Sequence, residues 1–433
     1  MDEKNRKKEK QGSDSQEDAY EFIKETIKQR PPERRQLLKV GGILVGAGAV
    51  FGLTAALVFS LVQPKISRIL ESKNQEKQQV EFPSDEEPGE EQQESKAVSV
   101  ETTDSEETIQ KEMTMEDYKN MYSEVVQKAR EASKSMVTVI GIKNDADWFH
   151  TPYESQISGL IVADNKQEMF ILTEYRIVEN VDRIQVQFCD GSIVDARFQK
   201  ADANTGLTIL KVQDSEVDGE TKKQIAVATL GNSYSISQGE PVIAAGSPMG
   251  YSDSLCYGAI TSTTNSVSKI DAEYGILTTD IVGSEDGSGI LLNGNGEVVG
   301  IITQSFARGD TKNIITGLSV SQVKELIEIL SNNEDIVYMG ITGQTITPEI
   351  SEKKGIPRGV FVEGVEVDSP AMQAGIQNAD VIVEIDGEKI ESVKGYQKKL
   401  QSCADGSTVK VKAMRQGTEG YIEVKFDVTV GAL

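Results

Sequence analysis

Residues 136–142 read MVTVIGI, and short runs of the same β-branched kind return along the chain as far as residue 304. Gly, Asn and Asp punctuate these runs. Many short strands separated by turn residues predict an all-β barrel or sandwich. The other runs are SGLIVA (158–163), MFILTE (169–174), IQVQF (184–188), TGLTILKV (205–212), EPVIAAG (240–246), GILTTDIV (275–282) and EVVGIITQ (297–304).

Helices are predicted on both sides of this β region. A helix is expected to begin after Thr114, with Asp117 completing its cap. A second helix, Ser321 to Leu330, is expected to close the region. Beyond residue 336 a separate unit begins, with four strand-like runs and a short helix that starts at Pro370 and stops at Gly375.

The N-terminal part predicts a membrane anchor. Residues 40–62 read VGGILVGAGAVFGLTAALVFSLV, without a charge, and a helix of that length spans about 34 Å, enough for a bilayer core. A buried core helix and a cleaved signal peptide are the alternatives. Residues 20–39 contain six Lys/Arg and residues 63–82 contain four, and this asymmetry favours a cytoplasmic N-terminus. We therefore expect a single-pass protein of the cell membrane, with a cytoplasmic tail (1–39) and extracytoplasmic C-terminal domains.

Residues 63–112 are predicted to form an acidic disordered tether. Between residues 81 and 112 there are twelve acidic residues and two basic ones, with Pro83 and Pro88. Such a stretch offers too little apolar area to offset the entropy lost on ordering.

The composition excludes several classes of function. The 433 residues carry a net charge of −24, so non-specific nucleic-acid binding is not expected. Three widely spaced Cys residues form neither a disulfide framework nor a zinc set, and no metal or cofactor is predicted. The chain has one His, His150, which limits acid–base chemistry severely.

Several segments form a set whose order and spacing are informative: FILT with IVE (170–173 and 177–179), DG (190–191), LTILK (207–211), GEPVIAAGSPMG (239–250), TTD (278–280) and GEVVGI (296–301). Together they resemble the trypsin-like domain of the HtrA/Deg serine proteases, and the part after residue 336 resembles their PDZ domain. The resemblance implies a mainly β fold: a chymotrypsin-like double β-barrel (113–333), followed by a PDZ (α+β) domain (336–433) and preceded by one transmembrane helix.

The catalytic positions implied by the resemblance do not hold the expected residues. Arg176 occupies the position of the family's His, and Gly206 that of its Asp. The nucleophile position is Gly287 when counted from Asn293 and Ser288 when aligned on Ser-Gly. Arginine stays protonated and cannot serve as a general base. The catalytic triad is therefore expected to be lost.

The resemblance also places other residues around this region. It puts His150 in a loop between the first two barrel strands, away from the nucleophile. Acidic Glu174, Glu285 and Asp286 are expected near Arg176, either as an ion pair that fills the cleft or as part of a site for a carboxylate.

The PDZ-like part keeps more of its family pattern. Tyr338-Met339-Gly340-Ile341 looks like the family's YIGI segment, whose backbone N–H groups form a carboxylate-binding loop. The resemblance implies binding of peptides or protein C-termini, assembly as a homo-trimer and a role in envelope protein quality control. We expect a catalytically inactive pseudoprotease. The alternatives are an active serine endopeptidase with a non-standard site around Ser288, and a structural envelope protein with neither activity.

Overall fold

The computed structural model describes residues 79–85, 114–143, 153–307 and 312–432. These residues all belong to one unit, residues 77–433. The expected tail (1–39), span (40–62), most of the tether and His150 lie outside the described residues. Within the part of the chain that is described, no helix combines the length and apolar character needed to cross a membrane.

The first described helix confirms its predicted start. Helix α2 (Met115–Ala132) begins after Thr114, whose side chain accepts from the backbone N–H of Asp117 while the Asp117 carboxylate accepts from that of Thr114. This reciprocal capping box satisfies two N–H groups that the helix itself leaves without partners. Val125 and Ala129 pack against the core between the barrels.

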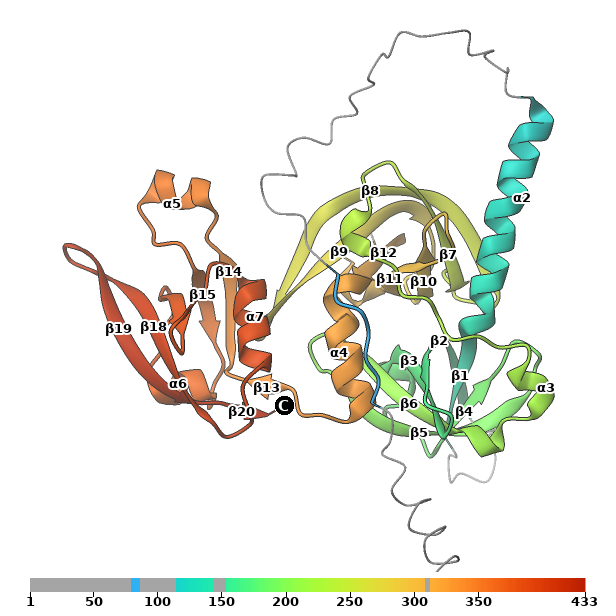
Figure 1. Ribbon diagram of the computed structural model, residues 1–433, viewed down its shortest axis with the longest axis horizontal. Helices are drawn as coiled ribbons and strands as arrows, with labels where there is room; N and C mark the ends of the chain where they lie inside the picture. Colours follow the sequence, from blue (N-terminus) through green and yellow to red (C-terminus); the bar gives the residue numbers. More distant parts are fainter. Residues whose placement is uncertain (1–78, 86–113, 144–152, 308–311, 433) are drawn as a thin grey trace, which may run out of the picture. The chain divides into compact units, whose positions relative to one another are not determined.

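Six antiparallel strands close into an N-terminal barrel in the order β1-β2-β3-β6-β5-β4 (Figure 1). Inward-facing apolar side chains such as Val139, Ile161 and Ile171 fill it. Half-buried and buried residues alternate over the first four positions of β1, which is the period-2 pattern of a strand with one face on a core, and the next three residues are buried or nearly so. The strands are β1 (Met136–Lys143), β2 (Tyr153–Asp164), β3 (Glu168–Glu174), β4 (Arg183–Gln187), β5 (Ile193–Ala201) and β6 (Leu207–Gln213).

A second closed barrel follows, in the order β10-β11-β12-β9-β8-β7. It leads into helix α4 (Val320–Asn332), which confirms the helix predicted at 321–330. The short helix η3 (Tyr175–Ile177) connects β3 and β4 of the first barrel, and α3 (Gly219–Lys222) lies in the connection between the two barrels. The strands are β7 (Pro241–Ser247), β8 (Ser254–Lys269), β9 (Ala272–Val282), β10 (Ser288–Leu292), β11 (Val298–Thr303) and β12 (Ile314–Ser319).

Residues 79–85, inside the expected tether, lie along α4 (Figure 1). Val80 is buried, and its backbone N–H and carbonyl both bond to the Asn332 side chain. Asp85 forms a 2.7 Å ion pair with Lys324, and both side chains are about nine-tenths buried. The prediction of a disordered spacer is therefore wrong for these seven residues, because one apolar anchor and one buried ion pair fix them.

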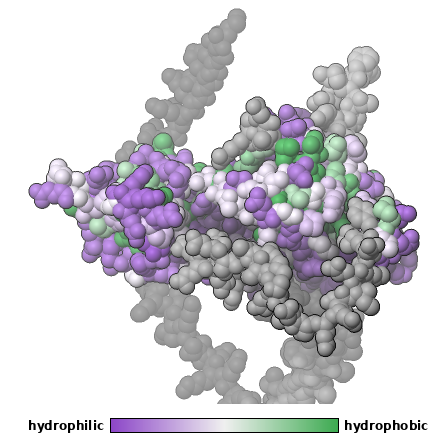
Figure 2. Space-filling view, turned by 90° about the horizontal axis from the view of Figure 1, so that it is seen from above, coloured by the Kyte–Doolittle hydropathy of each residue, from purple (hydrophilic) through white to green (hydrophobic). Residues whose placement is uncertain are grey.

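The PDZ region confirms the predicted α+β unit. Its main sheet runs β14-β15-β16-β18-β19, so β14 is an edge strand, and β17 pairs with β16. Figure 2 shows mostly hydrophilic residues on the visible surface of this region, which has its own apolar core. Its strands are β13 (Val337–Tyr338), β14 (Ile341–Thr345), β15 (Val360–Val365), β16 (Val381–Ile385), β17 (Glu388–Lys389), β18 (Thr408–Gly417), β19 (Gly420–Thr429) and β20 (Gly431–Ala432), and its helices are α5 (Pro348–Lys354), α6 (Pro370–Ala374) and α7 (Val393–Gln401).

Candidate functional site: an interbarrel site and a carboxylate-binding loop

The structure brings the three positions that the family resemblance assigns to a catalytic triad together where the barrels meet. Arg176 lies in η3, directly after β3, and Gly206 directly before β6. Strands β3 and β6 are paired, and the N–H of Tyr175 donates to the carbonyl of Gly206 at 2.7 Å. The Arg176 Nη2 donates to the backbone carbonyl of Asp286 at 3.2 Å. We call residues 174–176, 206 and 284–288 the interbarrel site.

A cation with two acidic neighbours occupies the position that the family resemblance assigns to the base. The Arg176 Nε lies 3.0 Å from a Glu174 carboxylate oxygen, and its Nη1 lies 3.9 Å from that of Asp286. The Glu174 side chain is 10 % exposed, whereas Arg176 is 47 % exposed and Asp286 is 84 % exposed. Burial raises the pKa of Glu174, and the hydrogen bond and charge of Arg176 oppose that rise. Glu174 and Asp286 are thus two of the three acidic neighbours of Arg176 expected from the sequence, the third being Glu285.

Gly206 provides no carboxylate and is held in a tight turn. Its φ of +71° lies in the left-handed region, and a Cβ at this position would meet nothing within 4 Å. The nearby Asp202 is buried and already accepts from the backbone N–H and hydroxyl of Thr205 at 2.8 and 2.6 Å. Its carboxylate is therefore used to build the turn.

Ser288 is buried inside β10. It is 2 % exposed and stands opposite Ser247 and Thr303 in the neighbouring strands. Its hydroxyl oxygen accepts from the backbone N–H of Ser158 at 3.2 Å. A nucleophilic serine needs a base within hydrogen-bond reach of its hydroxyl, and a backbone N–H cannot take a proton.

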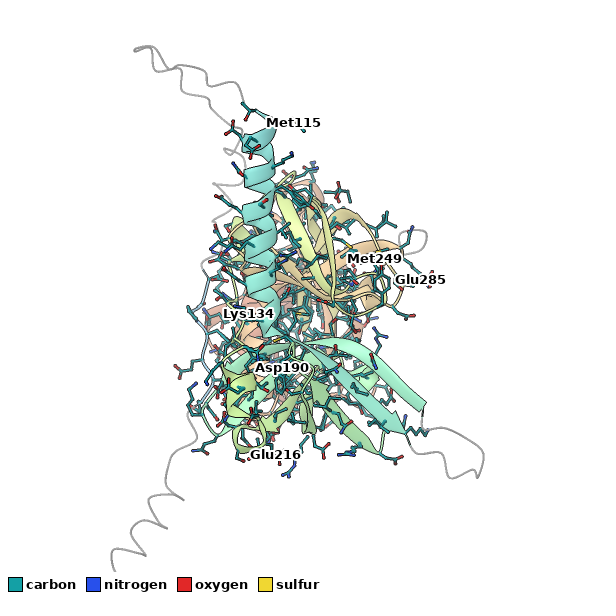
Figure 3. The ribbon with its side chains drawn as sticks, turned by 90° about the vertical axis from the view of Figure 1, so that its right-hand side faces the viewer. Met115, Lys134, Asp190, Glu216, Met249 and Glu285 are labelled. Carbon is teal, nitrogen blue, oxygen red and sulfur yellow. The ribbon has the colours of Figure 1, made fainter. Side chains whose placement is uncertain are left out.

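Gly287 sits where the backbone leaves no room for a side chain. A Cβ here would lie 2.7 Å from the Pro248 carbonyl oxygen and 2.9 Å from that of Ser284. The Gly287 N–H donates to the Ser284 carbonyl at 2.9 Å, so it is used within its own turn rather than presented to a ligand. A further bond, from the Ser284 N–H to the Pro248 carbonyl, ties this loop to the one that follows β7; Glu285 and Met249, labelled in Figure 3, mark the two loops.

The second site is the PDZ loop, residues 338–341. The backbone N–H groups of Met339, Gly340 and Ile341 converge on a single carboxylate, that of Asp271, at 2.7, 2.7 and 3.1 Å. Gly340 has a φ of +93°, and a Cβ there would lie 2.3 Å from the Cβ of Ser369. The loop therefore requires glycine and presents three converging N–H donors.

Two features of these sites were not predicted from the sequence. Asp271 lies between two strands, where an Asp is an ordinary turn residue, and no local signal marks its role. The lack of space at Gly287 comes from carbonyl groups that are distant from it along the chain or across a turn. Among the residues named from the sequence, Arg176, Gly206 and Gly287 lie together, whereas Ser288 points into the protein.

Comparisons with known proteins agree with this architecture. The model of the trypsin-like peptidase domain matches residues 157–301, and that of the PDZ domain matches residues 337–426. A probable periplasmic serine endoprotease DegP-like from Pseudomonas savastanoi pv. phaseolicola is 29 % identical over 282 residues, which is 64 % of this chain and 56 % of the relative. A serine protease Do-like HtrA from Bacillus subtilis is 28 % identical over 289 residues, covering 62 % of this chain and 63 % of the relative.

A solved structure, the HtrA-type protease AlgW with decapeptide, has a TM-score of 0.51 and 21 % identity, covering 72 % of this chain and 98 % of that one. That likeness concerns the fold alone. The chain spans 55 % of the length of a similar DegP-like relative from Halomonas elongata. Both domain matches lie in this order on one chain, so it carries a trypsin-like peptidase domain followed by a PDZ domain, and it is similar to DegP-like and HtrA serine proteases over 62–64 % of its length.

Proposed function

We propose that this chain is a membrane-anchored, extracytoplasmic pseudoprotease that binds polypeptides or protein C-termini through its PDZ domain in envelope protein quality control. The observation that carries the proposal is the interbarrel site. Its base position holds an arginine paired with Glu174. Its nucleophile position is either Gly287, with no space for a Cβ, or Ser288, whose side chain is buried.

The chemistry of the site supports the absence of proteolysis. Acyl transfer needs a hydroxyl, a neutral base beside it and N–H donors aimed at the developing oxyanion. Here the guanidinium cannot accept a proton, the Ser288 hydroxyl is buried against a backbone N–H, and the N–H of Gly287 is used within its turn. Without a triad, only about 10³–10⁴-fold acceleration over water is left to such a site, which is negligible for peptide bonds.

The PDZ loop supports the binding function. Three backbone N–H groups around Gly340 already hold a carboxylate, which is the chemistry of a peptide C-terminus. The solved HtrA-type protease is described with a decapeptide. Backbone donors need no particular side chains, so this activity can persist where catalysis does not.

The location and assembly belong to the same proposal. The uncharged stretch 40–62 would anchor the chain, with its N-terminus in the cytoplasm. Several curated relatives are called periplasmic, which agrees with C-terminal domains outside the cytoplasm. A homo-trimer is the assembly that we expect from the family resemblance.

Activity-based labelling tests the proposal. The full chain, purified in mild detergent because of the expected span, is incubated with an unfolded protein substrate and, separately, with a fluorophosphonate probe; the Bacillus subtilis relative serves as the positive control. We expect no turnover above buffer and no label. Turnover and labelling that disappear in Ser288→Ala but persist in Ser284→Ala, a hydroxyl of the same loop, would instead establish an active serine endopeptidase.

A further inference from the structure

Asp271 occupies the PDZ loop from within the same chain. It lies at the turn between β8 and β9, in the second barrel, with a φ of +56°. Its carboxylate accepts from the three loop N–H groups and, at 2.6 Å, from the hydroxyl of Tyr396 on α7. Asp271 is 5 % exposed and Tyr396 is completely buried. The carboxylate is therefore removed from solvent and surrounded by four donors.

The backbone of Asp271 also forms a hydrogen bond of the kind that a bound peptide strand would form. Its N–H donates to the carbonyl of Ile341, the first residue of β14, at 2.7 Å. Strand β14 pairs with β15 on one side and is the edge of its sheet on the other. A peptide that adds to a sheet edge makes the same kind of bond, and its terminal carboxylate enters the N–H cradle. Asp271 thus supplies both contacts of a ligand's last residue, using its side chain as the carboxylate.

The barrel side holds this turn in place. The side-chain amide of Asn204 donates to the carbonyl of Ile270, the residue before Asp271, at 2.8 Å. Asn204 belongs to the same turn as Gly206, so the loop that forms part of the interbarrel site also supports the occupant of the PDZ loop. The left-handed backbone of Asp271 is uncommon for a residue other than glycine, and it directs the carboxylate to the donors.

The donors around Asp271 are all neutral. Burial raises the pKa of the Asp271 carboxyl, and the hydrogen bonds from Tyr396 and the three backbone N–H groups act in the opposite direction. An incoming peptide carboxylate would have to take over the same donors, since two carboxylates side by side in a buried site repel each other.

We propose that Asp271 is an internal ligand that keeps the PDZ loop closed to C-terminal carboxylates until the β8–β9 turn withdraws. This inference rests on the proposed peptide-binding function and adds its regulation. If the loop is filled in 99 of 100 molecules, the apparent affinity for a peptide falls about 100-fold, since only the open fraction binds. Binding of a peptide and withdrawal of the turn would then be coupled.

Peptide affinity is the first test, on the full chain. The probe is a fluorescein-labelled decapeptide library that ends in valine with a free carboxylate, and its amidated twin. Asp271→Gly removes the internal carboxylate and suits the positive φ, and Asp271→Asn keeps the shape without the charge. Glu273→Ala is the control, because that carboxylate lies on the same hairpin but bonds to Ser266. We expect the free-carboxylate library to bind Asp271→Gly at least 10-fold more tightly than wild type or Glu273→Ala, and the amidated twin to bind none of them tightly.

Amide hydrogen exchange at residues 339–341 is the second measurement. The three N–H groups should exchange at least 10-fold more slowly in wild type than in Asp271→Gly. Equal exchange rates in wild type and Asp271→Gly would show that the Asp271 carboxylate does not bind the PDZ loop. The inference would then be wrong regardless of the peptide affinities. If wild type binds the library as tightly as Asp271→Gly, the competition is refuted while peptide binding stands. If no variant binds although the wild-type amides are protected, the peptide-binding proposal fails, and with it the gating role of Asp271.

Discussion

The interbarrel site and the PDZ loop are both filled by charged side chains of the chain itself, yet they differ in construction. In the interbarrel site Arg176 is half exposed, and Asp286 is almost fully exposed. In the PDZ loop Asp271 is buried and is held mainly by backbone N–H groups. A site built from side chains loses its chemistry with a few substitutions, whereas a site built from backbone donors keeps its chemistry as long as the backbone keeps its shape. The two sites should therefore respond very differently to mutation.

The largest difference is expected between two glycines. Gly340→Ala should lower the free energy of unfolding by about 3 kcal/mol or more, because a positive φ and a severe clash with Ser369 act together. Gly206→Ala, in the interbarrel site, should cost about 1 kcal/mol, since its φ is positive but its Cβ would meet nothing within 4 Å. Denaturant unfolding of both variants measures the two costs. Equal losses would contradict the view that Gly340 is sterically fixed whereas Gly206 is not.

Removing one donor from Asp271 should have the next largest effect. Tyr396→Phe deletes the hydroxyl that donates to the buried carboxylate and should destabilise the protein by about 1.5–3 kcal/mol, the range for hydrogen bonds to charged groups. The amides of residues 339–341 should also exchange faster. Tyr338→Phe is the control at the edge of the same loop, with an expected change below about 0.5 kcal/mol. A Tyr396→Phe variant as stable as this control would show that the Tyr396 hydroxyl does not stabilise Asp271 in the PDZ loop.

The same contrast explains what the sequence could predict. Short β-type runs predicted an all-β barrel or sandwich, and Thr114 with Asp117 predicted the start of α2, because these signals lie within a few residues of each other; two barrels were what the family resemblance implied. The family resemblance assigned Arg176 and Gly206 to the base and carboxylate positions, and their residue types then predicted a missing base and a missing carboxylate. The partners of Asp271 lie 68 to 70 residues away for the loop N–H groups and 125 for Tyr396, and backbone donors leave no trace in residue type. The ordering of Val80 and Asp85 on α4 also depends on distant partners.

A smaller, pH-dependent effect is expected in the interbarrel site. Arg176→Ala should destabilise the protein by about 1 kcal/mol at pH 7, because it leaves the mostly buried Glu174 carboxylate without its cation. Burial holds the pKa of Glu174 above its ordinary value, so the folded protein binds this proton more tightly than the unfolded chain. Glu174 therefore contributes to the free energy of unfolding at acid pH, and this contribution is lost as the pH rises through the pKa that Glu174 has in the folded protein.

Loss of Arg176 should raise the pKa of Glu174 further. The free energy of unfolding lost in Arg176→Ala should therefore become smaller as the pH falls from 7 towards 4.5. Urea unfolding at several pH values measures it. The control is Arg183→Ala, whose partner Asp195 is half exposed, as Arg183 is. A penalty for Arg176→Ala that stays constant with pH would mean that Glu174 is not the group left uncompensated.

The smallest effect is expected from Asp286→Asn. The Asp286 side chain is 84 % exposed, and its oxygen lies 3.9 Å from the Arg176 Nη1, where solvent screens the attraction. The closer contact, from Arg176 to the Asp286 backbone carbonyl at 3.2 Å, does not depend on the side chain and should survive. The free energy of unfolding should therefore change by less than about 0.5 kcal/mol, in contrast to the large loss expected at Tyr396. Thermal unfolding could instead show that Asp286→Asn destabilises the protein as much as Arg176→Ala does. In that case the side-chain charge of Asp286, rather than its backbone carbonyl, holds Arg176 between the two barrels. The interbarrel site and the PDZ loop would then differ only in how deeply their charged groups are buried.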